Sequence, residues 1–218
     1  MRSATAHHFK PRKCVKSPRV ETFQGETLSV KQSGSCSGCS RATIEGIIRI
    51  GVIYGLRRSG ILGLRWQDID FETGTLQIRH KVAEVRINGK RQLVRSNDLK
   101  TEASRRAFPL SDDIRQRLER RKAQIEETEQ KAPNRTADAD YVFVDANGKL
   151  LSPEYVSDHF RWRIAHSDLP KIRFHDLRHT CATLLLHEGC SLREIQSYLG
   201  HASYLTTTRY ATSTPAAR

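Results

Sequence analysis

The stretch ATIEGIIRIGVIYG, which begins at Ala42, repeats its apolar residues with the period of an α-helix. The positions on its apolar stripe are Ile44, Ile47, Ile48, Val52 and Ile53. After Gly60 a second apolar group predicts another short helix: Ile61, Leu62 and Leu64. Both helices are expected in the core, with the basic segment Gly-Leu-Arg-Arg at 55–58 as the elbow between them.

Between Thr75 and Leu110 the pattern changes to short β-rich runs. They are TLQIRHKVAEVRI, RQLVR and SRRAFPL, separated by Asn88-Gly89 and by the polar stretch 96–101. Asn-Gly between two apolar runs is a strong hairpin signal. The pattern therefore predicts a small antiparallel sheet, with Lys100 in or beside a hairpin turn.

Helix start and stop signals organise the rest of the chain. Ser111 is expected to cap a charged helix, and Ser152 is a second cap because proline follows it. A helix through FHDLRHTCATLLLHEG can stop at Gly189. The segment Ser191-Leu-Arg-Glu is a capping box for a last helix that Gly200 ends. These signals predict an α+β fold, mainly helical with a small antiparallel sheet.

Residues 1–40 have no hydrophobic period and are rich in Ser, Gly, Lys and Arg, so they are expected to form an arm or linker. Residues 41–218 are then the folded domain. The chain has 37 Lys and Arg against 24 Asp and Glu, a net charge of +13. Such a surplus favours nucleic acid as the partner. The basic arm is interpreted either as a solvated tail or as a DNA-contacting segment.

Neither a membrane span nor an export signal is apparent in the sequence, which predicts a cytoplasmic protein without a membrane partner. The five cysteines are odd in number, so reduced thiols are expected. Cys36 and Cys39 are half of a zinc knuckle without a clear second pair. His175 and His179 have the spacing of a zinc protease, but Asp176 replaces the usual Glu. Neither pattern predicts a metal or another cofactor.

Several polar residues together contain the parts for attack on a phosphodiester. The candidates are Arg57, Lys100, His175, Arg178, His201 and Tyr210. Arginine forks bind phosphate oxygens, a Tyr hydroxyl can serve as a nucleophile, and Lys or His can exchange protons. His175 and Arg178, three residues apart on a predicted helix, are expected to project from one face, toward a cleft or solvent.

With these motifs the chain resembles the catalytic domain of the tyrosine recombinase family, of the phage integrase type. The motifs are YGLRRSGILGLRW, LKTEASRRAFPL, FHDLRHTCATLLLHEG, YLGHAS and TTTRYA, in the family order. The resemblance implies that Arg57 and Arg178 clamp the scissile phosphate of double-stranded DNA and that Tyr210 forms a 3′-phosphotyrosyl link. It implies that Lys100 protonates the leaving 5′-oxygen, and that His175 and His201 orient the phosphate and assist proton transfer. No ATP or metal is implied.

Three departures from the family pattern qualify the resemblance. Gly60 replaces the usual Glu, the helical core-binding domain is expected to be absent, and the segment after Tyr210 is short. The family assembles as a tetramer on two duplexes, which this chain is expected to do only if it is complete. Site-specific recombination is therefore the first hypothesis. The alternatives are a catalytically weak DNA-binding remnant and a nicking-closing enzyme of the type IB topoisomerase kind.

Overall fold

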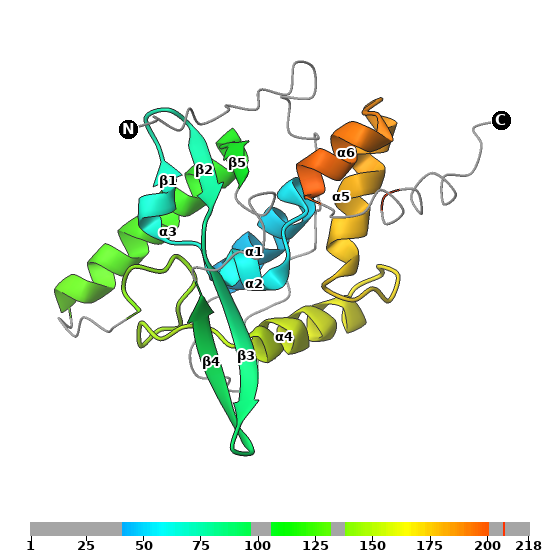
Figure 1. Cartoon of the computed structure of the whole chain (residues 1–218). Helices are drawn as coiled ribbons and strands as arrows, with labels where there is room; N and C mark the ends of the chain where they lie inside the picture. The colour runs from blue at the N-terminus through cyan, green and yellow to red at the C-terminus, as the bar shows by residue number, and fades with distance from the viewer. Residues whose placement is uncertain (1–40, 97–105, 132–137, 201–206, 208–218) are drawn as a thin grey trace, which may run out of the picture.

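The computed structural model describes residues 41–96, 106–131, 138–200 and Thr207. Helices surround a central helix, α1 (Arg41–Tyr54), and two small β-sheets lie on one side of it (Figure 1). The α+β class predicted from the sequence is confirmed. The predicted arm, residues 1–40, lies outside the described residues.

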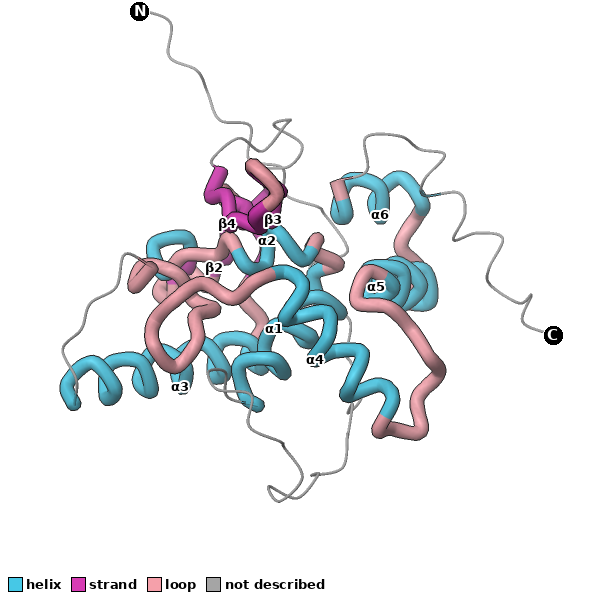
Figure 2. Tube along the Cα trace, turned by 90° about the horizontal axis from the view of Figure 1, so that it is seen from below, coloured by secondary structure: helices cyan, strands magenta, loops and turns pink. Residues whose placement is uncertain are grey.

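The helix α1 is buried on more than the one stripe that its sequence suggests. Besides Ile44, Ile47 and Ile53, it buries Ile50 and Tyr54. A helix that sits on a surface would keep one polar face. Here α2, α3, α4 and α5 all contact α1, so it forms the centre of the fold (Figure 2).

The elbow after α1 depends on a glycine. Gly55 has φ of +59°, and a Cβ at this position would lie 2.3 Å from Leu199 Cδ2 and 3.1 Å from Cys181 Sγ. The chain therefore turns against the last two helices without room for a side chain. The next helix, α2 (Arg58–Leu62), begins before Gly60, which corrects the expectation that it begins after this residue.

The β-rich region forms two sheets, which corrects the expectation of one. After the short helix η2 (Trp66–Asp68), the strands β1 (Ile69–Asp70), β2 (Thr75–Ile78) and β5 (Arg106–Pro109) pair in the order β1-β2-β5. The strands β3 (Lys81–Ile87) and β4 (Lys90–Ser96) pair only with each other. They are split off because β5 returns to pair along β2, from Thr75↔Pro109 to Ile78↔Arg106.

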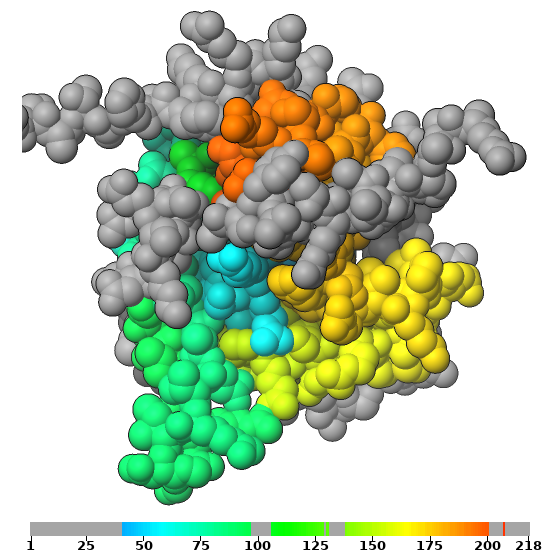
Figure 3. Space-filling view, turned by 45° about the vertical axis from the view of Figure 1, so that its right-hand side comes forward, coloured from blue at the N-terminus to red at the C-terminus, as the bar shows by residue number. Residues whose placement is uncertain are grey.

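The predicted hairpin at Asn88-Gly89 is confirmed. Both residues have positive φ, +50° for Asn88 and +76° for Gly89, and Ile87 pairs with Lys90 across the turn. The hairpin projects from the body of the molecule (Figure 3). An ion pair between Arg91 on the hairpin and Glu154 connects it to α4 (Pro153–Ala165).

The predicted helix starts differ in their outcome. Ser152 caps α4, because its Oγ accepts from the Tyr155 backbone N–H at 3.0 Å. At the start of α3 (Asp112–Lys131), by contrast, Ser111 Oγ has no hydrogen-bond partner among the described residues. Its backbone N–H instead donates to Tyr54 Oη at 3.1 Å, which ties α3 to α1.

The last two helices form a pair. They are α5 (Asp176–His187) and α6 (Leu192–Leu199). The capping box of Ser191 and Glu194 is confirmed, and Gly200 ends α6 with φ of +63°. Cys181 on α5 is a free, buried thiol, whereas Cys190 is disulfide-bonded, which corrects the expectation of reduced thiols at that position.

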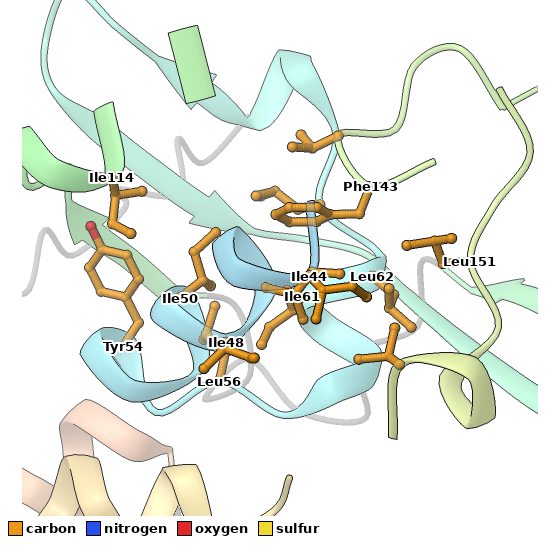
Figure 4. Packing of buried hydrophobic residues seen from close by; sticks show 14 of the residues in the cluster. Ile44, Ile48, Ile50, Tyr54, Leu56, Ile61, Leu62, Ile114, Phe143 and Leu151 are labelled. Atoms are coloured by element: carbon orange, nitrogen blue, oxygen red, sulfur yellow. The ribbon is translucent and has the colours of Figure 1, made fainter. Parts of the chain in front are cut away.

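Two apolar clusters stabilise the described part of the chain. The larger one joins α1, α2, the sheets, α3, α4 and the first turn of α5, and Figure 4 shows Tyr54 beside Ile114 within it. The smaller cluster lies between α5 and α6 and consists of Cys181, Ala182, Leu185, Cys190, Ile195 and Leu199. In the described ranges no helix is long and apolar enough to cross a membrane.

Candidate active site

Arg57 lies on the elbow between α1 and α2, and its side chain is exposed. Its backbone is fixed, because its carbonyl accepts from the N–H groups of Gly60 at 2.9 Å and Ile61 at 3.1 Å. The guanidinium thus projects into solvent from a rigid turn, as a phosphate-binding group requires.

Arg178, in contrast, is only 3% exposed. Its Nη1 donates to the Gly55 carbonyl and its Nη2 to the Leu199 carbonyl, both at 2.6 Å. One guanidinium therefore connects the elbow that carries Arg57 with the end of α6. The expectation that Arg178 and His175 share an open face is wrong, because His175 precedes α5 and is exposed while Arg178 points inward.

A third arginine at this place was not predicted from the sequence. Arg106 begins β5, its Nη1 donates to the Tyr198 carbonyl at 2.6 Å, and its guanidinium carbon lies 5.5 Å from the centre of the Phe108 ring. Burial lowers the pKa of Arg106 to about 10, and repulsion from Arg178 and Arg57 acts in the same direction. The guanidinium is still charged at neutral pH. The available signal was the strand alternation, which puts Arg106 on the same side as Phe108.

His175 is the exposed titratable group beside these arginines. Its ring centre lies 5.6 Å from that of His179, with the rings edge to face. Partial desolvation lowers the pKa of His175, and the neighbouring charges of His179 and Arg178 lower it further, while Asp176 opposes them. A neutral imidazole near pH 7 can accept a proton, which is what a base next to a nucleophile must do.

Asp176, at the start of α5, is engaged by a neighbour. It accepts from the Arg173 backbone N–H at 2.8 Å and from Arg173 Nη2 at 3.1 Å. These hydrogen bonds lower the pKa of Asp176. The position that would be a general base in a zinc protease is therefore an ion-paired carboxylate. In the described ranges no group of three or more His, Cys, Asp or Glu residues could hold a metal ion.

The three remaining candidates, Lys100, His201 and Tyr210, lie outside the described residues. The sequence places His201 directly after Gly200, which ends α6. Thr207, three positions before Tyr210 in the sequence, is fully buried. Of the six predicted site residues, the structure therefore places Arg57, His175 and Arg178.

Gly60 is buried inside α2. A Cβ at this position would lie 3.6 Å from Ile78 Cγ2, which is an ordinary van der Waals contact. The space beside the glycine is thus apolar and open enough for a methyl group.

Positive charge is concentrated where these elements meet. Within the described residues neither Arg57 nor Arg106 forms a salt bridge with a carboxylate, and Arg106 Nε is buried without a hydrogen-bond partner. Arg178 adds a third guanidinium to the same place, because it donates to the Leu199 carbonyl next to the Tyr198 carbonyl that accepts from Arg106. Such an arrangement favours an approaching anion.

A family model for the phage integrase family matches residues 30–217. The chain belongs to this family. This integrase-family chain is 28% identical over 191 residues to a XerC-like tyrosine recombinase of Caldanaerobacter subterraneus, covering 84% of this chain and 48% of that protein. It is also 28% identical over 194 residues to the type 1 fimbriae regulatory protein FimE of Escherichia coli, covering 88% of this chain and 85% of FimE.

Solved structures show the same fold. The integrase of the Tn1549 transposon, in complex with transposon right-end DNA, superposes with a TM-score of 0.64 at 21% identity, covering 89% of this chain and 57% of that one. The XerA recombinase has a TM-score of 0.57 at 21% identity, covering 81% of this chain and 60% of the other. The chain thus spans about half the length of several of its relatives.

Proposed function

We propose that this chain is the catalytic part of a site-specific DNA recombinase, which cleaves and rejoins double-stranded DNA in the cytoplasm through a 3′-phosphotyrosyl intermediate. The observation that carries the proposal is the meeting of Arg57, Arg106 and Arg178 at the elbow and the end of α6. Family membership and the net charge of +13 support it.

In the proposed cleavage step, the oxygen of Tyr210 attacks the scissile phosphorus while Arg57 and Arg178 balance the charge on the nonbridging oxygens. The proton of Tyr210 passes to His175 or His201. The bond from phosphorus to the 5′-oxygen breaks, and Lys100 gives this oxygen a proton. Rejoining is the same step in reverse with another 5′-hydroxyl, so the bond energy stays in the protein-DNA ester.

The buried setting of Arg178 suits this role. A guanidinium that donates to two fixed backbone carbonyls has little freedom to reorient, so its remaining N–H groups have fixed directions. Preorganised donors of this kind stabilise developing charge without reorganisation during the reaction. Because Arg178 donates to Gly55, it also fixes the turn from which Arg57 projects.

The test uses nicked suicide duplexes made from DNA that flanks the gene. The wild type should give a covalent protein-DNA adduct on a denaturing gel, and Tyr210→Phe should give none. Tyr204→Phe is the matched control, since it removes a hydroxyl from the same segment, and it should retain the adduct. An equal adduct in Tyr210→Phe would overturn the assignment of the nucleophile.

Two further outcomes separate the alternatives. Salt-sensitive DNA binding without an adduct in any variant would identify a DNA-binding remnant, and Gly60→Glu would then test whether the replaced residue is the cause. Relaxation of supercoiled plasmid without a preferred site would identify a nicking-closing enzyme of the topoisomerase kind.

A further inference from the structure

The end of α6 is held by two arginines from different elements. The consecutive carbonyls of Tyr198 and Leu199 accept from Arg106 Nη1 and Arg178 Nη2, each at 2.6 Å. Both carbonyls belong to the last turn of the helix, where backbone acceptors lack partners within the helix and cations are favourable. Arg106 reaches this turn from the sheet, whereas Arg178 reaches it from α5.

The position of Arg106 is fixed from its other side as well. Its guanidinium lies over Phe108, and Phe108 is itself packed between Tyr54 and Tyr198, with ring centres 5.2 Å apart in both pairs. The hydroxyl of Tyr198 donates to the Ile53 carbonyl at 3.2 Å, next to the elbow. The sheet, the end of α1 and the end of α6 thus meet around Arg106.

Arg106 is half-buried, and taking a charge even partly out of water without a carboxylate partner costs free energy. Arg106 has no carboxylate partner among the described residues, and its buried Nε makes no hydrogen bond there. A neutral residue would fill this strand position at lower cost in desolvation. The two hydrogen bonds that Arg106 and Arg178 make to consecutive carbonyls of α6 indicate that the charge of Arg106 is kept for its effect on this helix end.

We propose that Arg106 is a positioning residue for the recombination reaction. It holds the last turn of α6, and thereby the acceptor of Arg178 and the start of the segment that leads to His201, and it adds charge behind the phosphate clamp. The effect of Arg106 on cleavage rests on the proposed function, whereas its effect on the position of α6 does not.

Three variants of the full chain test the proposal. Arg106→Met keeps the aliphatic stem and loses the charge. Arg106→Lys keeps the charge but has fewer hydrogen-bond donors. Arg121→Met is the matched control, because Arg121 also donates to backbone carbonyls, to Val144 at 2.7 Å and Val142 at 3.4 Å, but on α3 away from the site. Urea unfolding first establishes that each variant is folded at the assay temperature.

Single-turnover cleavage of the suicide duplex is the first readout. Arg106→Met should lower the rate by about 100-fold, the size of effect that follows from a misplaced catalytic group. Arg106→Lys should recover part of the loss, and Arg121→Met should stay near the wild-type rate. DNA affinity at fixed salt should change far less than the cleavage rate. A rate for Arg106→Met within about threefold of the Arg121→Met control overturns the proposal.

A bridging 5′-phosphorothiolate in the substrate excludes an alternative role. Its sulfur leaves without needing a proton, so it restores cleavage when the missing group is the general acid. If Arg106 acts by positioning, the sulfur substrate should leave the Arg106→Met defect in place while it rescues Lys100→Met. Full rescue of Arg106→Met would overturn the proposal in favour of a role in proton transfer.

Hydrogen exchange at residues 192–200 provides a readout that does not depend on cleavage. Faster exchange in Arg106→Met than in Arg121→Met is the expected result, and equal exchange overturns the proposal. If the wild type gives no covalent adduct, the proposed function fails while this measurement still decides whether Arg106 holds α6.

Discussion

The two apolar clusters of this protein are built differently. The larger one gathers side chains from helices and strands around α1. The smaller one, between α5 and α6, has six buried residues and is connected to the elbow by the guanidinium of Arg178. The comparison shows that apolar packing stabilises the body, whereas directional hydrogen bonds position the elbow and the end of α6, where we propose the active site.

Removal of Arg178 should have the largest effect, because it removes the hydrogen bonds that connect the elbow with the end of α6. Arg178→Met leaves the carbonyls of Gly55 and Leu199 without their donor, which should cost about 3 kcal/mol of unfolding free energy for two charged hydrogen bonds. The adduct rate should fall by about 1000-fold or more because a donor to the phosphate is lost. Urea unfolding and the suicide-duplex assay measure the two effects. Cleavage at the wild-type rate by folded Arg178→Met would contradict the proposed role of Arg178 in binding the phosphate.

Cavities placed in each cluster should sharpen the comparison. Ile61 and Ile195 are both fully buried, one in each cluster. Either change to Ala should cost about 2–5 kcal/mol locally. Ile61→Ala should lower the global unfolding free energy, whereas Ile195→Ala should speed hydrogen exchange mainly in α5 and α6. Uniform acceleration across the chain in Ile195→Ala would show that the two clusters unfold as one unit.

Helix caps offer a smaller perturbation of the same kind. Ser191 caps α6, and Ser152 caps α4 with an equivalent hydrogen bond at 3.0 Å. Each Ser→Ala change should cost about 1 kcal/mol. Ser191→Ala should also slow the adduct-forming step, because α6 leads to the site, whereas Ser152→Ala should not. Equal slowing in both variants would argue that the effect is global.

The smallest expected effect is a shift in the pKa of His175. Its pKa should lie below the ordinary value of 6.5, and His179→Gln should raise it by removing a neighbouring charge, while Asp176→Asn should lower it. Because the folded protein binds this proton less tightly than the unfolded chain, its contribution to unfolding free energy declines as the pH falls below about 6.5. NMR titration measures the pKa of His175 in each variant, with His187→Gln as control. A His175 pKa in His179→Gln equal to that of the wild type would contradict the contact between His175 and His179.

Local signals in the sequence identified most helix boundaries. Ser152, Ser191 and Gly200 act through neighbours within four positions, so their roles follow from spacing alone. The burial of Arg178 depends on carbonyls at Gly55 and Leu199, of which the first is 123 positions away. The helical period also misled, since it treated His175 as a helical neighbour of Arg178 although His175 precedes the helix.

The division of the strands likewise depended on distant pairing. Alternation identified the runs TLQIRHKVAEVRI and SRRAFPL, which contain β2 and β5. It identified neither the break between β2 and β3 nor the pairing of β2 with β5. The same pairing brings Arg106 to the end of α6, which explains why the sequence did not indicate it as a site residue. Its partner carbonyl at Tyr198 lies 92 positions further along the chain.

The free thiol of Cys181 can report on the packing of α5 when its labelling is followed on the peptide that contains it. It is fully buried under the Gly55 turn, it donates to the Ile53 carbonyl at 3.4 Å, and burial raises its pKa to about 12. A maleimide therefore cannot react with it while α5 remains packed on α1. The rate of maleimide labelling at Cys181 therefore measures how often the α5–α6 pair opens. A DNA duplex bound at the proposed site should lower this labelling rate.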